Sequence, residues 1–201
     1  MDNLTHSLFA VTLARTAIGR AGRGTTAALI LASNIPDIDI VATARDGASY
    51  LQWHRGPTHG PLSLIALGVP TAVIVWLWLR FRDRRRGRVL PSRATFPALA
   101  AISILGVTLH LAMDFPTSYG TRSMSPFDWH WFALDWMPII DIYLLAALAM
   151  GLLVGAGSQP SRRRNAAIVL VLMAANYGVR GAAHHEALAL GPRARSRLPG
   201  R

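Results

Sequence analysis

Long apolar runs separated by short, arginine-containing polar segments dominate the sequence. The clearest run, Gly60–Leu79, has no charged residue over a length that suits one crossing of a bilayer. The other runs are Leu4–Ile18, Thr25–Ala44, Ala94–Asp114, Met137–Gly157 and Ala166–Leu190. Because apolar runs of about 20 residues predict membrane helices, we expect an all-α, polytopic integral membrane protein. The number of runs indicates about five or six transmembrane helices with short loops.

Some of these runs are irregular. Pro36 interrupts Thr25–Ala44, and proline breaks a helix because it lacks the backbone donor. A broken helix at membrane depth is tolerated where it lines protein or a polar cavity. Leu4–Ile18 is short for a span, and Arg180 lies within the last run. We interpret residues 1–190 as one membrane-embedded domain and the basic residues 191–201 as a disordered tail.

The composition supports a membrane protein and limits its chemistry. Of 201 residues, 52% are hydrophobic and 15% charged, against about 25% charged in soluble domains. This apolar content excludes intrinsic disorder, and a soluble nucleic-acid-binding domain would have to bury several complete runs. All 21 basic residues are arginines, and no cysteine is present. A metal site must therefore use His, Asp, Glu or backbone oxygen.

The arginines indicate an orientation in the membrane. If the runs alternate across the bilayer, the segments with Arg20 and Arg23, 80–93 and 162–164 share one face. Their basic excess predicts that this face is cytoplasmic. All seven histidines and five of the aspartates then gather at the opposite, non-cytoplasmic face. We therefore expect a multi-pass cell (plasma) membrane protein with a polar site at the non-cytoplasmic face. The arginines of the tail disagree with this topology unless the last run does not span.

The residues gathered at that face are typical metal ligands. His110 and Asp114 are four apart and so share one helix face, and Asp37 and Asp39 lie at the helix break that Pro36 causes. Imidazole and carboxylate together suit Zn, Mn or Fe. The candidate ligands are His6, Asp37, Asp39, His54, His59, His110 and Asp114. They can hold one divalent ion, or two ions about 3.5–4 Å apart.

The other polar residues of this face are candidates for roles beside the metal ligands. Arg55, beside the histidines, can hold a phosphate or carboxylate in bidentate fashion. Asp141 either orients a ligand imidazole or stabilises a helix N-terminus. The roles of the remaining polar residues of this face are open between the site and the membrane interface: Asp135, His130, His184 and His185.

The order of the motifs resembles a known family. The motifs are Thr5-His6, Pro36-Asp37-Ile38-Asp39, His54-Arg55-Gly56-Pro57-Thr58-His59 and His110-Leu111-Ala112-Met113-Asp114. They are similar to those of the YdjM-like membrane-bound metal-dependent hydrolases, inner-membrane proteins described in other bacteria as LexA-regulated. The resemblance covers roughly residues 1–157. It implies a metal-dependent hydrolase, with the seven candidate ligands at the metal and Arg55 beside them.

These observations lead to one preferred function and two alternatives. We expect a metal-activated water to attack an ester or phosphoester of a lipid-like or amphiphilic substrate, with Arg55 stabilising an anionic group. The same cluster in a membrane ion- or metal-handling transporter is the first alternative, although no acid or histidine lies inside the spans near the cytoplasmic face. A non-catalytic scaffold is the second, and it leaves the clustering unexplained. The bilayer is the expected partner and nucleic acid is not.

Overall fold

The computed structural model describes residues 1–86, 92–154 and 157–195, and this part of the chain is helical without a named strand. Its elements are α1 (Asn3–Ala14), η1 (Ala17–Ala21), α2 (Thr25–Ala32), η2 (Ile35–Ala44), α3 (Gly47–Trp53), η3 (Pro57–His59), α4 (Ser63–Arg86), α5 (Phe96–Asp114), α6 (Ile142–Leu153) and α7 (Gln159–Arg195). The α elements are α-helices, and the η elements are 3₁₀ helices. The predicted all-α class is therefore confirmed.

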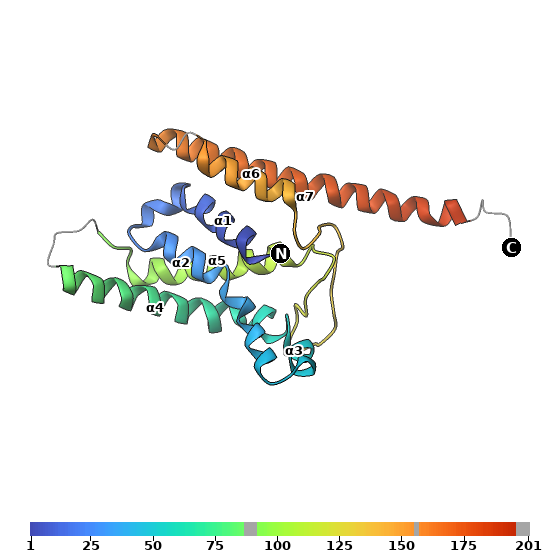
Figure 1. Ribbon diagram of the computed structural model, residues 1–201, viewed down its shortest axis with the longest axis horizontal. Helices are drawn as coiled ribbons and strands as arrows, with labels where there is room; N and C mark the ends of the chain where they lie inside the picture. The colour runs from blue at the N-terminus through green and yellow to red at the C-terminus, as the bar shows by residue number, and fades with distance from the viewer. Residues whose placement is uncertain (87–91, 155–156, 196–201) are drawn as a thin grey trace.

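The helices pack in two groups that share α1. The first group is α1, α2, α4 and α5, with a core that includes Leu29, Leu79 and Leu99. In the second, α6 and α7 lie side by side over α1 (Figure 1), and Leu148 and Val169 are among the residues buried between them. Helix α5 packs against α2 and α4, and its C-terminal end carries the predicted His110 and Asp114 pair.

The predicted break near Pro36 is present. Helix α2 ends at Ala32, and η2 continues from Ile35 at an angle of 44° to it. Pro36 lies in the first turn of η2, where its missing N–H costs nothing. The Asn34 side chain donates to the carbonyl of Ile30 at 2.7 Å and so satisfies one acceptor that the break frees. The bend places Asp37 beside the end of α5 and Asp39 beside the loop that contains Arg55 and Thr58.

The number of candidate spans is lower than predicted. In the part of the chain that the structure describes, α4, α5 and α7 are long and apolar enough to cross a membrane, and the bent pair of α2 and η2 makes a fourth. Helices α1 and α6 have 12 residues each, which gives about 18 Å at 1.5 Å per residue, against a hydrocarbon core of about 30 Å. The predicted five or six spans is therefore too many, because hydropathy alone does not separate a short packed helix from a spanning one.

The arginine-rich segment after Leu79 also differs from prediction. We expected a loop from residue 80, but α4 continues as a helix to Arg86. Arginine is a good helix former. Three guanidinium groups also lie over aromatic rings of the preceding turn, with 4.4–4.5 Å between Cζ and the ring centre: Arg80 over Trp76, Arg82 over Trp78 and Arg85 over Phe81. At the C-terminus, α7 extends to Arg195, inside the predicted tail, and residues 196–201 lie outside the described residues.

Candidate metal centre

Helix α5 supplies two of the site residues. His110 and Asp114 lie one turn apart with fully buried side chains, and His110 Nε2 is 3.6 Å from Asp114 Oδ2. The Nδ1 atom of His110 donates to the carbonyl oxygen of Ser33 at 2.8 Å. Since that oxygen only accepts, the neutral ring carries its proton on Nδ1. Its Nε2 lone pair therefore points to the interior of the site.

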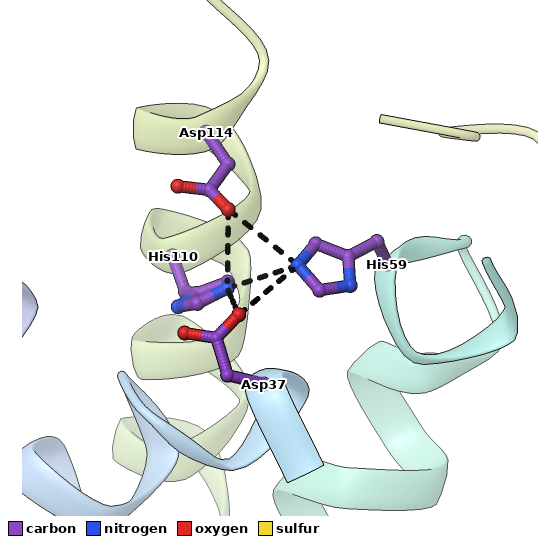
Figure 2. Close-up of side chains that lie close together, drawn as sticks. All are labelled: Asp37, His59, His110 and Asp114. Atoms are coloured by element: carbon purple, nitrogen blue, oxygen red, sulfur yellow. Dashed lines mark hydrogen bonds and ion pairs between the residues drawn. The ribbon is translucent and has the colours of Figure 1, made fainter. Parts of the chain in front are cut away.

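The bend in the chain adds Asp37. Its Oδ1 atom lies 3.7 Å from Nε2 of His59 and 3.7 Å from Nε2 of His110. Figure 2 shows the Asp37 side chain reaching from η2 toward both imidazoles, with Asp114 on the far side of His110.

The third segment at the site is η3, which ends at His59. A Cβ atom on Gly60 would lie 1.8 Å from the carbonyl oxygen of Ser125, so only glycine allows the chain to pass here. The Thr58 hydroxyl donates to Asp39 Oδ2 at 3.1 Å and accepts from His59 Nδ1 at 3.0 Å. This relay also keeps the proton of His59 on Nδ1. Its Nε2 atom then lies 3.2 Å from Nε2 of His110.

The four inward-facing atoms fit one divalent cation. One donor atom each of Asp37, His59, His110 and Asp114 lies within 4.8 Å of all the others. Four tetrahedral ligands about 2.1 Å from one ion lie about 3.4 Å apart, close to the separations of 3.2–3.7 Å given above. Two imidazole lone pairs facing each other beside two carboxylates repel one another unless a cation lies between them. The donor set therefore suits a divalent metal ion.

Asp39 lies outside these four atoms and supports the loop that carries His59. Its carboxylate accepts from the backbone N–H of Arg55 at 2.7 Å and from Thr58, and it lies 3.2 Å from His54 Nδ1. His59 Nδ1 is 3.8 Å away. Such a carboxylate behind a ligand imidazole orients the ring and raises its basicity. His54 faces Asp39 and stacks on Tyr50 at 4.4 Å, so it too lies behind His59.

His6 lies beside His110 and Asp114, outside the four donor atoms. Its ring stacks on His110 with 4.1 Å between ring centres, and its Nε2 atom is 3.2 Å from Asp114 Oδ1. The amino group of Met1 also contacts this oxygen, and burial lowers the pKa of that amine. Asp114 therefore presents one oxygen to His6 and Met1 and the other to the four-atom group.

Arg55 connects the site to the irregular segment after α5. One guanidinium nitrogen lies 3.0 Å from Asp114 Oδ2, and another donates to the carbonyl of Gly120 at 3.1 Å. The side chain is 4% exposed, so the positive charge is held beside the carboxylate in a place that water scarcely reaches. Sequence reasoning missed Ser33, Thr58, Thr117 and Gly120. Only Thr58 was marked by a motif, because it lies between the two histidines of the HRGPTH stretch.

The structure thus brings four of the seven candidate ligands to one point and sets the other three around them. His6, Asp39 and His54 each contact a member of the four or its loop, and their role as ligands stays a prediction. The model of the YdjM inner membrane protein family matches residues 1–187, which include every one of these residues. The chain belongs to this family.

A second comparison finds a relative whose activity is not defined. The chain is 32% identical over 127 residues to the uncharacterized protein YfhP of Bacillus subtilis. The match covers 61% of the chain but spans only 35% of the length of YfhP. No solved structure matches the chain. The family places the protein in the inner membrane, in agreement with the three or four candidate spans.

Proposed function

We propose that this YdjM family protein is a metal-dependent hydrolase that cleaves an ester or phosphoester bond of a lipid-like or amphiphilic substrate. The observation that carries the proposal is the four-atom group of Asp37, His59, His110 and Asp114. A Zn, Mn or Fe ion held by these residues would supply a Lewis acid and would activate water at neutral pH.

The residues around the group have defined tasks in this proposal. Thr58 and Asp39 fix the proton of His59 on Nδ1, and the Ser33 carbonyl does the same for His110. Both rings therefore keep their Nε2 atoms free for the cation. Arg55 holds Asp114 in position and provides positive charge where a carbonyl or phosphoryl group becomes more negative during the reaction.

A cavity beside His59 supports an amphiphilic substrate. It has a volume of about 600 Å³, within the usual range for ligand pockets. Besides His59, its lining is largely apolar and includes Leu111, Phe115, Leu134, Trp136 and Tyr177. The cavity lies between the end of α5 and the middle of α7, two candidate spans. A molecule with an apolar chain can enter it from the bilayer and present its polar bond to His59.

The proposal is tested by turnover. We expect wild-type protein in nanodiscs, loaded with Zn²⁺ or Mn²⁺, to hydrolyse at least one member of a panel of acyl esters and phospholipids. The His110→Ala variant, purified and loaded identically, should lose this turnover, and chelation should abolish that of the wild type. Metal-loaded protein that turns over no member of the panel would contradict hydrolysis. Metal uptake into sealed vesicles would favour transport instead.

We further propose that the site faces the non-cytoplasmic side. Figure 1 shows η1, the end of α4 and the start of α7 at one end of the bundle, away from the end of α5 that carries the site. These segments carry the arginine clusters, and arginine-rich segments favour the cytoplasmic side.

This orientation predicts a labelling result. Because the chain has no cysteine, an introduced thiol is the single target for a maleimide. We expect Asp128→Cys, exposed on the segment after α5, to react with a membrane-impermeant maleimide in intact spheroplasts, and Arg84→Cys on α4 to react only after lysis. The reverse pattern would place the site on the cytoplasmic side.

A further inference from the structure

A second cavity, of about 260 Å³, lies at the arginine-rich end of the bundle. It forms where the end of α1, η1 and the start of α7 meet. Four arginines line it, together with small and polar residues: Arg15, Arg20, Arg162 and Arg163. The proposed hydrolase mechanism does not use this cavity, since it lies at the other end of the molecule from the metal centre (Figure 1).

The lining of this cavity contains four arginines and no acidic residue. All of its lining residues come from residues 3–36 and 142–185, and neither segment contains an Asp or Glu. Arg15, Arg162 and Arg163 are half-buried rather than extended into solvent. Like charges held together in partly buried positions repel one another, so the cavity is favourable for an anion.

A backbone contact holds one of these arginines in place. Arg15 donates one guanidinium nitrogen to the carbonyl of Leu152 at 2.8 Å, which ties α1 to the end of α6. Guanidinium groups match phosphate oxygens in charge and geometry.

The position of the cavity relative to the membrane indicates which phosphate-bearing molecule it binds. The candidate span in α7 begins at Gln159, which lines the cavity, so the cavity lies at the boundary between apolar and polar membrane regions. Basic pockets between membrane helices on the cytoplasmic side bind anionic head groups. We propose that this cavity binds the phosphate of an anionic phospholipid headgroup.

The arginines at the end of α4 form a basic surface outside the cavity and serve as a comparison. Arg84 and Arg85 are exposed, and Arg85 lies over the ring of Phe81 on its own helix. Neither residue lines the cavity. Exchanging these two arginines removes as much charge as exchanging two from the cavity, which makes them a matched control.

The test measures lipid binding in detergent solution. Phosphatidylglycerol is titrated into the wild type, the double variant Arg20→Gln/Arg163→Gln and the control Arg84→Gln/Arg85→Gln, with the melting temperature as readout. Phosphatidylcholine and inorganic phosphate are titrated in parallel. We expect phosphatidylglycerol to stabilise the wild type and the control equally, and to bind the double variant about tenfold or more weakly.

Three results of the titrations would overturn the proposal. If the control binds phosphatidylglycerol as weakly as the double variant, the effect is one of diffuse charge. If phosphatidylcholine stabilises the wild type as much as phosphatidylglycerol, no anion is needed. If inorganic phosphate stabilises it as much, the free anion is the ligand. If the double variant is unfolded without lipid, the single variant Arg20→Gln, which changes only an exposed residue, replaces it. Native mass spectrometry of the wild type then counts bound phosphatidylglycerol, and a count of zero also overturns the proposal.

Discussion

Wild-type protein loaded with Zn²⁺ and freed of excess metal is expected to retain about one ion per chain, and His110→Ala almost none. The reason is geometric, because His110 Nε2 lies within 3.2–3.7 Å of donor atoms of the other three residues of the group. Its removal takes away one ligand and also the imidazole against which His59 is placed. Elemental analysis by inductively coupled plasma mass spectrometry measures the ratio of metal to protein.

The control for this experiment is another histidine of the same chain. His130 is exposed on the segment after α5, and its ring contacts Phe132 rather than a carboxylate. We expect His130→Ala to keep the full metal content. Size-exclusion elution and circular dichroism show whether each variant remains folded. Equal metal content in the wild type and a folded His110→Ala variant would contradict the site, and two ions per chain would require a second position beyond the four-atom group.

The sequence predicts part of this site because some of its geometry is local. His110 and Asp114 are four residues apart in an uninterrupted apolar run, so their shared face follows from the helix period alone. The positions of Asp37 and His59 beside that face do not follow from local geometry. It depends on a 44° bend, a short 3₁₀ turn and the close contact of Gly60 with Ser125. No spacing in the sequence encodes these contacts between distant segments.

The two aspartates of the Pro-Asp-Ile-Asp motif show where sequence reasoning ends. Both were expected at the metal because the helix is interrupted there. The interruption, however, continues as a 3₁₀ helix of about three residues per turn, so side chains two residues apart diverge by about 120°. Asp37 therefore reaches His110, whereas Asp39 reaches the backbone of Arg55. The sequence identified both residues but not this division between them.

The fold was predictable to a similar degree. The uncharged run Gly60–Leu79 lies mainly in α4, and Ala94–Asp114 corresponds to α5. The run Met137–Gly157 was taken as a span but yields only α6, Ile142–Leu153. Asp141 accepts from the first N–H groups of α6 and pairs with Arg180 of α7, so α6 begins where a buried carboxylate fixes its N-terminus. A hydropathy average over the whole run does not show where a helix begins inside it.

Asp39 provides the second large effect. We expect Asp39→Ala to bind Zn²⁺ about 10- to 100-fold more weakly than the wild type, the usual result of removing a carboxylate that orients a ligand histidine. At saturating metal the variant should still take up about one ion per chain, unlike His110→Ala, because all four donors remain. Competition with a chromogenic chelator measures both the dissociation constant and the stoichiometry.

A milder variant isolates the relay between Asp39 and His59. Thr58→Val keeps the shape of the side chain and removes the hydroxyl that accepts from His59 Nδ1 and donates to Asp39. We expect it to weaken Zn²⁺ binding in the same direction as Asp39→Ala but less, because Asp39 still supports the backbone of Arg55. Thr108→Val is the matched control, since the Thr108 hydroxyl bonds only to the carbonyl of Ile104 in its own helix. If Asp39→Ala lost the ion completely while Thr58→Val bound it like the control, Asp39 would be a ligand itself rather than the residue that orients His59.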